Sequence, residues 1–395
     1  MKTVRFLPLR APLLLALAVP LAGLAFRFET AIPGGNARLV EQHAETLLIE
    51  PERRTSEGDW FYWRFRIQGA QGQTLRLRFT RPVVGVRGPC VGTNGRWRWL
   101  GRNFTPGGFD YTFAPGESCV DFAQAWPYLP DDWERFLTTL PNQSAFRRET
   151  LCTTPKGRAL PLLRTVPARQ SPSAQGAPPS NYILLTARHH AQESSANFVL
   201  EGAVEYLLEH PRAALLAVPF IDLDGALDGE PGKNRRPRDH NRDYDSNPIH
   251  PEVRAIQRLL RQIPPSARIW ILDLHAPWIR GGCNELVHQV HKPFHQNLRH
   301  RLAQLIPQPN PFAYTPVDDV LWGSGWNTPA NYTAGTPFIV WAATNLPNCV
   351  LATTFEIPFA QAKGIEVTPD AARAFGRALA EGLLKTLSEA AVEAK

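Results

Sequence analysis

The chain of 395 residues contains few of the short motifs that identify a hydrolase or a metal site directly. Neither H-E-x-x-H nor G-x-S-x-G occurs, which disfavours the zinc proteases and serine hydrolases that carry those motifs. The cysteines form no C-x-x-C pair, which argues against a zinc ribbon or a dithiol redox centre. With 43% hydrophobic and 20% charged residues, the composition is still that of globular protein, enough for one large domain or two smaller ones.

Long hydrophobic runs are scarce, and the run at the N-terminus is shorter than the roughly 20 residues that a membrane-spanning helix needs. It covers residues 11–26 and follows the basic residues Lys2, Arg5 and Arg10. This pattern is typical of a secretory signal, with cleavage after Ala25. We therefore expect a signal peptide over residues 1–25 and export to the periplasm or the extracellular space. An uncleaved anchor is the alternative, and no further stable membrane partner is expected.

Basic residues are only in small excess over acidic residues. The formal net charge of +7 falls to about +4 when the three basic residues of the signal segment are removed. The densest basic segment, residues 233–242, mixes basic and acidic side chains and belongs to no recognised nucleic-acid-binding module. We therefore expect no nucleic-acid partner. Oligomeric state is not encoded in any recognisable feature.

The cysteines of an exported protein are candidates for disulfides. Cys90 with Cys119 is one possible pair and Cys283 with Cys349 another, which leaves Cys152 over. The sequence alone leaves this pairing open.

Two kinds of hydrophobic pattern divide the chain. Before residue 150, short runs such as 59–67 and 74–79 alternate apolar and polar residues between glycine-rich turns, which predicts a small antiparallel β-sandwich. After residue 180, buried-strand runs alternate with helical patterns, which predicts an α/β domain with a mixed, largely parallel sheet flanked by helices. The expected strands cover residues 182–186, 213–221, 267–273 and 350–357, and the expected helices 196–208, 251–263 and 369–389.

These patterns predict a β-sandwich domain over residues 27–150, a linker or exposed loop over 151–180, rich in Pro, Ala, Ser and Arg, and an α/β domain over 181–395. The ligand site of such a domain lies at the carboxyl ends of its strands.

The candidate site residues follow the ends of those expected strands. His190 and Glu193 come after the strand at 182–186, and His275 comes after the strand at 267–273. A lone H-x-x-E occurs often by chance, and His189 competes with His190 because its spacing to Glu193 also suits a helix. Two histidines and one carboxylate nevertheless match the usual ligand set of a hydrolytic zinc ion, which keeps its fourth position for water. We therefore predict one Zn²⁺ per chain.

A zinc hydrolase also needs a general base, and Glu356 in the apolar run at 350–357 is the best candidate. The alternative for Glu356 is the solvated face of an edge strand. Asp239 is suited to accept the outer ring proton of a metal-bound histidine. The fork of Arg242 suits a substrate carboxylate, and either Arg235 or Arg236 is placed to polarise the carbonyl that is cleaved. Any one of these arginines, taken alone, also suits a solvated surface.

These residues and their contexts resemble the zinc carboxypeptidases of the carboxypeptidase A type. Residues 187–202, beginning Ala-Arg-His-His-Ala-Gln-Glu, resemble the first zinc motif, most closely that of the cytosolic-carboxypeptidase-like branch. Asp273-Leu-His275 resembles the third-ligand motif and Thr354-Phe-Glu356 the strand that bears the catalytic glutamate. The segment 239–244 resembles the one whose Asn and Arg, here Asn241 and Arg242, hold the terminal carboxylate of the substrate. The resemblance covers about residues 180–390, and the β-rich region with residues 125–137 resembles the small domain that precedes the catalytic domain in the same branch.

The chain departs from the family in three places. Ala191-Gln192 replaces the usual Pro-Gly, the oxyanion arginine is not assigned between the two candidates, and the substrate-capping tyrosine has no clear counterpart other than Tyr332. The pocket for the terminal side chain is expected within residues 318–349, which contain Trp322, Trp326, Tyr332 and Trp341; ordinary core packing is the alternative for these aromatics.

The resemblance implies a zinc metallocarboxypeptidase that hydrolyses the C-terminal peptide bond of peptides or proteins. Two alternatives stay open. One is a zinc amidohydrolase acting on cell-wall peptides or acylated amino acids, and the other is a zinc-containing protein that binds peptides without cleaving them.

Overall fold

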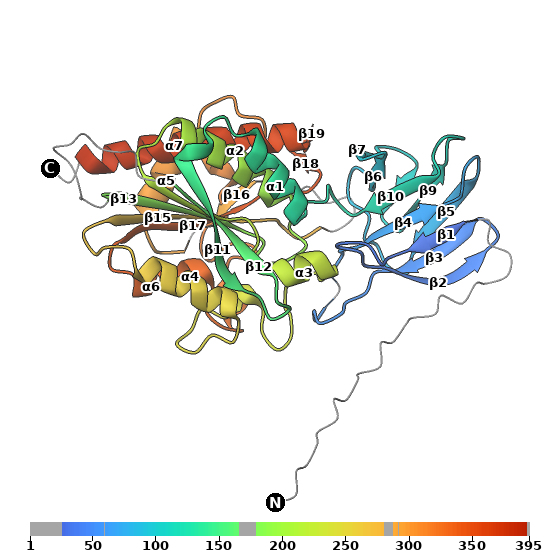
Figure 1. Cartoon of the computed structure of the whole chain (residues 1–395), viewed down its shortest axis with the longest axis horizontal. Coiled ribbons are helices and arrows are strands. Elements are labelled where there is room, and N and C mark those ends of the chain that lie inside the picture. Colours follow the sequence, from blue (N-terminus) through green and yellow to red (C-terminus); the bar gives the residue numbers. More distant parts are fainter. Residues whose placement is uncertain (1–25, 59, 166–178, 280–286, 291, 393–395) are drawn as a thin grey trace, which may run out of the picture.

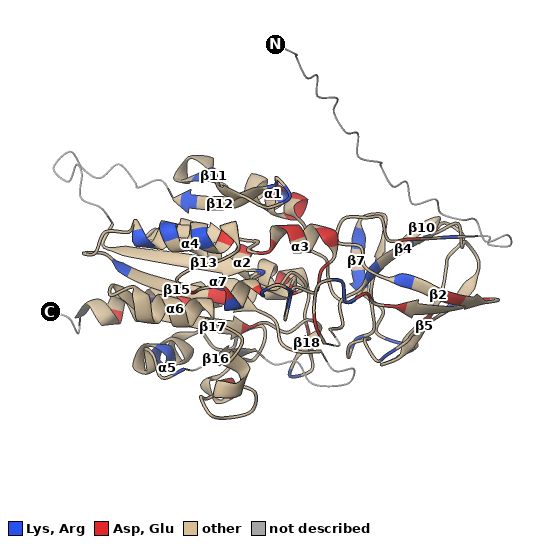
Figure 2. Cartoon of the chain, turned by 90° about the horizontal axis from the view of Figure 1, so that it is seen from below, with Lys and Arg blue, Asp and Glu red and all other residues tan. Residues whose placement is uncertain are grey.

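Two β-rich regions follow one another in the computed structural model, which describes residues 26–58, 60–165, 179–279, 287–290 and 292–392 (Figure 1). The expected signal peptide and Cys283 lie outside these residues. Within the described part of the chain, no helix is both long and apolar enough to cross a membrane. Figure 2 shows acidic and basic positions interspersed through both regions, with basic residues prominent on one helix of the second.

The first region, here called the sandwich domain, covers residues 26–125 and contains two five-stranded sheets. One sheet has the order β1 (Arg27–Glu29), β4 (Arg64–Gln68), β10 (Cys119–Ala123), β6 (Cys90–Thr93), β7 (Arg96–Trp99). The other has the order β2 (Arg38–His43), β3 (Thr46–Glu50), β5 (Thr74–Phe79), β9 (Gly108–Thr112), β8 (Phe104–Thr105). The expected antiparallel domain is confirmed, except that β3 and β5 run parallel.

The core of the sandwich domain follows from the period-two pattern. In β5, Leu75, Leu77 and Phe79 are buried while the intervening polar residues are exposed or half-buried. They pack in one cluster with Phe65 and Phe122 of the opposite sheet. The same cluster includes four residues from the second region: Ala276, Ile279, Phe359 and Ala360. The two regions therefore share part of a core.

The second region, here called the α/β domain, begins at Tyr128 and is built on a seven-stranded sheet. Its order is β11 (Phe146–Thr153), β12 (Ala159–Thr165), β14 (Ala214–Val218), β13 (Asn181–Ala187), β15 (Arg268–His275), β17 (Cys349–Glu356), β16 (His288–Val290). The four strands β14, β13, β15 and β17 are parallel, and β11, β12 and β16 join antiparallel. A small hairpin adds β18 (Gln361–Ala362) and β19 (Ile365–Glu366). The expected mixed, largely parallel sheet is confirmed.

Helices cover both faces of this sheet (Figure 1). On one face lie α2 (Ser195–Glu209), α5 (Gln296–Leu305) and α7 (Pro369–Val392), and on the other α4 (Pro251–Arg261) and α6 (Phe338–Asn345). The remaining helices are α1 (Pro130–Thr139) and the short α3 (Leu223–Asp228). Because both faces are covered, the central strands are mostly apolar, and β13 and β15 are almost entirely buried.

The segment expected as a linker differs from the prediction where the structure describes it. Residues 151–165 belong to the hairpin of β11 and β12, which joins the larger sheet through pairing of Leu163 with Ala217. Leu160, Leu162 and Leu163 are buried in the core of the α/β domain, as are Trp133 and Leu137 of α1. Pro161 and the surrounding polar residues interrupt the period that would have indicated a strand. Residues 166–178 lie outside the described part.

The possible disulfide between Cys90 and Cys119 is not formed, because both thiols are free. Cys90 in β6 pairs with Ala123, at the opposite end of β10 from Cys119, so the two side chains are too far apart to join. Cys152 and Cys349 are also free thiols.

Candidate metal centre and active-site cleft

The register of three parallel strands brings the expected site residues to one edge of the sheet. His275 ends β15 and pairs with Glu356, which ends β17, while Ala187 at the end of β13 pairs with Leu274. The loop that follows Ala187 carries His190 and Glu193, so residues distant in the sequence emerge side by side. Glu356 is not on an edge strand, because β17 lies between β15 and β16.

His190, Glu193 and His275 converge with their ligand atoms facing one another. The Glu193 carboxylate lies 2.8 Å from Nδ1 of His190 and 2.8 Å from Nδ1 of His275, and the two Nδ1 atoms are 3.2 Å apart. Donor atoms around a tetrahedral zinc ion with bonds of about 2.0–2.1 Å lie about 3.3 Å from one another. The spacing and the donor types therefore fit a zinc ion bound by two Nδ1 atoms and one carboxylate. All three residues are buried.

Each of the two histidines also meets a carboxylate on its outer ring nitrogen. Nε2 of His275 lies 2.8 Å from Asp273, and Nε2 of His190 lies 3.3 Å from Asp239. A carboxylate there holds the proton on Nε2 and leaves the lone pair of Nδ1 for a metal. The structure thus brings Asp239 beside the outer nitrogen of His190, and its role as acceptor of the ring proton stays a prediction. Asp273 was missed as a partner, although its position two residues before His275 was a readable signal.

The electrostatics of this cluster favour a cation. Burial alone would lower the pKa of His275, but Asp273 and Glu193 outweigh burial and hold that pKa well above its usual value. Burial likewise would raise the pKa of Asp273, yet His189 and His275 keep it below its usual range. Together with Glu193 and Asp239, Asp273 surrounds the imidazoles with three carboxylates. A divalent cation would offset most of that charge, and buried charges need such a partner.

The residues His190, Glu193 and His275 are here called the metal cluster. His189 lies behind them and does not compete with His190 as a ligand. Nδ1 of His189 is 2.8 Å from Asp273 and Nε2 is 2.8 Å from the hydroxyl of Tyr244, so both ring nitrogens have partners within the core. The group of His189, Asp273 and His275 also meets the geometric criterion for a metal site. It shares His275 through the nitrogen that faces away from the first cluster, and we interpret it as the hydrogen-bonded support of that cluster.

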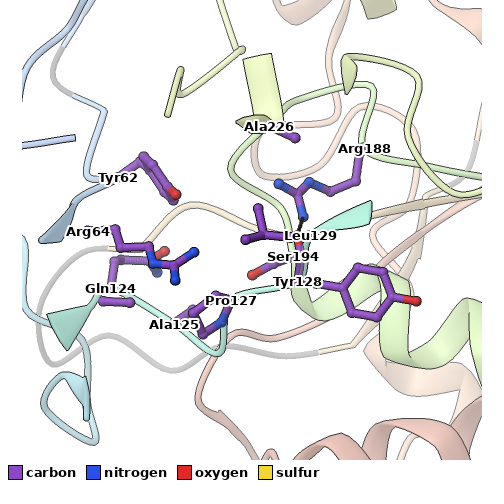
Figure 3. A pocket seen from close by; sticks show the side chains of 11 residues that line it. Tyr62, Arg64, Gln124, Ala125, Pro127, Tyr128, Leu129, Arg188, Ser194 and Ala226 are labelled. Atoms are coloured by element: carbon purple, nitrogen blue, oxygen red, sulfur yellow. Dashed lines mark hydrogen bonds between the residues drawn. The ribbon is translucent and has the colours of Figure 1, made fainter. Parts of the chain in front are cut away.

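The loop that carries the metal ligands is anchored at the junction of the two domains, shown in Figure 3. Arg188 has a left-handed backbone with φ of 63° and is buried, and Nη1 of its guanidinium donates to the carbonyl of Tyr128. Burial lowers the pKa of Arg188 to about 10. The hydroxyl of Ser194 donates to the carbonyl of Trp126 over 2.7 Å. The cavity between them is also lined by Tyr62 of the sandwich domain, so both domains position this loop.

Asn241 and Arg242 line the same cleft as the metal cluster. Asp239 begins their short 3-10 turn by accepting a hydrogen bond from the Asn241 backbone N–H over 2.7 Å. Arg242 donates to two backbone carbonyls, of Asn241 and of Asn331, which orient its guanidinium. The hydrogen bonds that the described residues give the Arg242 guanidinium go to backbone carbonyls and not to a carboxylate, so this guanidinium in the cleft is suited to an anionic ligand.

Glu356 and Tyr332 complete the cleft. Glu356 is 8% exposed and lines the cleft together with His190 and His275. The Tyr332 hydroxyl donates to Asn327 over 2.8 Å, and the Arg242 guanidinium lies 5.7 Å from the centre of the Tyr332 ring. Burial raises the pKa of Tyr332 to about 12, while Arg242 opposes the rise and Glu356 adds to it.

The aromatic residues expected in the side-chain pocket separate into two groups. Trp326 and Tyr332 line the cleft, and Trp322 packs beside Tyr332 with ring centroids 5.6 Å apart. Trp341 is only 2% exposed and belongs to the core, so the alternative of core packing holds for this residue.

Neither arginine proposed to polarise the carbonyl lines the cleft, so that prediction is corrected. Nη1 of Arg235 lies 2.6 and 2.7 Å from the two oxygens of buried Asp222, and Arg236 is exposed and pairs with Glu57. Both guanidiniums are therefore held away from the metal cluster. The cleft is instead lined by Lys233, from the same basic segment, which was overlooked because three cations lie within four positions.

A third group of potential metal ligands, His240, His250 and Glu252, lies beside the segment that carries Asn241. The rings of His240 and His250 stack with centroids 3.7 Å apart and 19° between their planes. Because imidazole binds a metal in the plane of its ring, stacked rings do not point at a common ion. Nε2 of His250 is also 2.9 Å from the Arg238 carbonyl. We interpret this group as packing that supports the neighbouring loop.

Comparison with known proteins agrees with the fold and the cleft. No family model matches the chain. In sequence it is similar to cytosolic carboxypeptidase 1 of Mus musculus, with 29% identity over 188 residues, 41% of this chain and 15% of that protein. It is also similar to the Homo sapiens cytosolic carboxypeptidases 6 and 2, with 27% identity over 42% of this chain and 31% over 55%. These matches cover 36% and 28% of the two human proteins, so the chain spans less than half the length of the relatives it matches.

Solved structures show the same architecture over nearly the whole chain. A metallo-carboxypeptidase from Burkholderia cenocepacia superimposes with a TM-score of 0.72 at 17% identity and covers 93% of this chain and 100% of its own. A metallo-carboxypeptidase from Pseudomonas aeruginosa, in complex with (2-guanidinoethylmercapto)succinic acid, superimposes with a TM-score of 0.73 at 18% identity, covering 92% and 99%. At these identities the superpositions establish the fold.

The chain thus shares the fold of the solved metallo-carboxypeptidases and is similar in sequence to the cytosolic carboxypeptidases. It carries the sandwich domain in front of the α/β domain, as the sequence resemblance implied.

Proposed function

We propose that the protein is a zinc-dependent carboxypeptidase that hydrolyses the C-terminal peptide bond of peptides or proteins. The observation that carries the proposal is the cluster of His190, Glu193 and His275, in which the two Nδ1 atoms lie 3.2 Å apart and each lies 2.8 Å from an oxygen of the Glu193 carboxylate, with both histidines lining a cleft. The same cleft is lined by a carboxylate, Glu356, and by a guanidinium, Arg242. The names of the relatives and of the structural neighbours support the reaction class.

The chemistry divides between the two ends of the cleft. When bound, zinc supplies Lewis acidity and lowers the pKa of a coordinated water toward about 7. Glu356 takes a proton from the attacking water and later returns it to the leaving amine. Arg242 and Asn241 bind the terminal carboxylate of the peptide and so place its last peptide bond beside Glu356.

A mass-spectrometric time course with a peptide library and zinc-loaded protein tests this proposal. We expect stepwise shortening of peptides with free C-termini and no shortening of the same peptides with amidated C-termini. The Glu356→Gln variant serves as the matched control for the protein, because it keeps the metal ligands. Cleavage within peptides, or cleavage of an N-acylated amino acid but of no peptide, would instead assign an endopeptidase or an amidohydrolase.

We also propose that the protein is exported, on the basis of the basic and apolar segment at residues 1–25. The relatives are called cytosolic, so their location does not support this proposal. Cell fractionation with a C-terminal epitope tag, followed by N-terminal sequencing, tests it. A mature chain that begins near Phe26 supports export, and an intact N-terminus in the cytosolic fraction would refute it.

A further inference from the structure

Hydrolysis of a peptide bond creates negative charge on the carbonyl oxygen. As the water oxygen bonds to the carbonyl carbon, the π electron pair of the carbonyl moves onto its oxygen and the proton of the water passes to Glu356. A donor or cation placed where this charge develops lowers the barrier. Arg235 and Arg236 do not occupy that place, because each pairs with a carboxylate outside the cleft. This inference rests on the proposed function and concerns which residue takes the role.

Lys233 stands on a loop that packs directly against the metal ligands. Gly232 has φ of +88°, and a Cβ added to it would lie 2.3 Å from the backbone N of Ala191. The backbone N–H of Gln192 donates to the carbonyl of Pro231 over 3.1 Å. Only a glycine allows this approach, and it sets the backbone of Lys233 beside the loop that carries His190 and Glu193.

The other side of the same loop is fixed by the sandwich domain. The backbone N–H of Glu57 donates to the carbonyl of Asn234 over 2.9 Å, and that of Arg236 donates to the carbonyl of Thr55 over 2.9 Å. The loop is therefore held between the metal-binding loop and the first domain. Its conformation is set by backbone hydrogen bonds before any substrate arrives.

An aromatic residue of the sandwich domain contacts the Lys233 side chain. Nζ of Lys233 lies 5.2 Å from the centre of the Trp60 ring, within the range of a cation–π interaction. Trp60 is itself 6% exposed, and its ring lies 4.5 Å, edge to face, from that of Trp278, three residues beyond His275. The Trp60 ring is thus a fixed support for the ammonium group at the rim of the cleft.

We propose that Lys233 is the cation that stabilises the developing oxyanion, and that Trp60 of the sandwich domain is its positioning residue. Lys233 is the cation of the 233–238 segment that lines the cleft with His190, His275 and Glu356. The two domains then form one active site, because the first supplies the aromatic face that holds a catalytic residue of the second.

The test compares Lys233→Met and Lys233→Arg with the control Arg236→Met, which removes a cation from the same loop outside the cleft. Zinc content and circular dichroism establish that each variant is loaded and folded. Lys233→Met is expected to lower kcat about 100- to 1000-fold, Lys233→Arg to restore most of it, and Arg236→Met to leave kcat unchanged. A phosphonamidate peptide, which mimics the oxyanion, should lose affinity for Lys233→Met, while a product amino acid with only its carboxylate should not.

Trp60 is tested by the same two readouts. Trp60→Leu is expected to lower kcat about 2- to 5-fold in the wild-type background and to change nothing further when Lys233 is already Met. Trp60→Phe, which keeps an aromatic face, should retain more of the activity. An equal loss in both backgrounds would mean that Trp60 acts only on stability.

Two outcomes separate this inference from the proposed function. Peptide hydrolysis that survives Lys233→Met within about threefold overturns the role of Lys233 and leaves the carboxypeptidase proposal standing. A wild type that cleaves no peptide, yet binds the phosphonamidate more tightly than Lys233→Met does, overturns the carboxypeptidase proposal while keeping Lys233 as the anion contact.

Discussion

Replacing Asp273 by asparagine should weaken zinc binding although Asp273 does not face the metal position. The carboxylate of Asp273 accepts three hydrogen bonds of 2.8 Å, from Thr186 Oγ1, His189 Nδ1 and His275 Nε2, and is fully buried. The oxygen of an asparagine can still accept hydrogen bonds on one side, but its amide nitrogen cannot accept the hydrogen bond that His275 donates. The imidazole of His275 then loses its partner or moves its proton to Nδ1, the atom that faces Glu193 and the metal.

The magnitude follows from losing one such carboxylate–histidine contact. Removal of a carboxylate behind a metal-bound histidine costs about 10- to 100-fold in metal affinity, or about 1.4–2.8 kcal/mol. We expect a loss within this range for Asp273→Asn. A smaller loss is expected for Asp239→Asn, because the contact of Asp239 with His190 is longer, 3.3 Å against 2.8 Å.

Competition with a zinc chelator of known affinity measures this effect, and the melting temperature of the zinc-free form reports any damage to the fold. Thr186→Val is the matched control, since it removes one donor to Asp273 and leaves the carboxylate in place. If Asp273→Asn bound zinc as tightly as the wild type, His275 would not be a ligand through Nδ1 and the metal assignment would be wrong.

Three further predictions test the base, the anchor and the buried ion pair. Glu356→Gln should keep its zinc and lose about 100- to 10,000-fold in kcat, and near-native turnover with full zinc content would remove Glu356 from the base role. Arg242→Ala should reduce kcat/KM on peptides with a free C-terminal carboxylate far more than any residual activity on amidated peptides; equal losses on both would make Arg242 structural. Burial alone would raise the pKa of Asp222, but His240 and Arg235 outweigh it and lower that pKa, so Asp222 contributes stability above its unfolded pKa of about 3.9 and loses it as the pH falls further. Asp222→Asn should therefore cost stability in urea unfolding at pH 7, and the difference from wild type should shrink below pH 4; a constant difference would contradict the ion pair.

Many strands and helices could be predicted from the sequence because their hydrophobic patterns are local. The alternation of residues 74–79 predicted a strand that the structure places at Thr74–Phe79, and the helical spacing of residues 369–389 predicted α7. The strand at Ala159–Thr165 was missed, since Pro161 and charged neighbours hide its period and its pairing with β14 is distant in sequence. A local hydrophobic pattern indicates which face of a segment is buried. It does not reveal pairing with a strand about fifty residues away in the sequence.

The candidate site could also be predicted in part from the sequence. Three motifs indicate zinc-dependent hydrolysis, because that reaction needs their donor types next to strand ends: H-x-x-E, D-x-H and the glutamate at a strand end. The position of Asp273 two residues before His275 would have predicted its contact with the His275 ring, but the prediction was not made. Lys233 shows a limit of the sequence, which offers Lys233, Arg235 and Arg236 side by side without distinguishing them.

The sequence by itself determined the domain order, the strand and helix types of the long patterned segments, and the chemical types of the candidate metal ligands and of the proposed base and anchor. Only the tertiary structure decided that His190 and not His189 faces Glu193, and that Lys233 lines the cleft while Arg235 and Arg236 do not. Adjacent side chains leave a turning backbone in different directions, and those directions depend on φ of Arg188, on the close approach of Gly232 and on contacts with the other domain. These are long-range properties of packing, and no window of the sequence contains them.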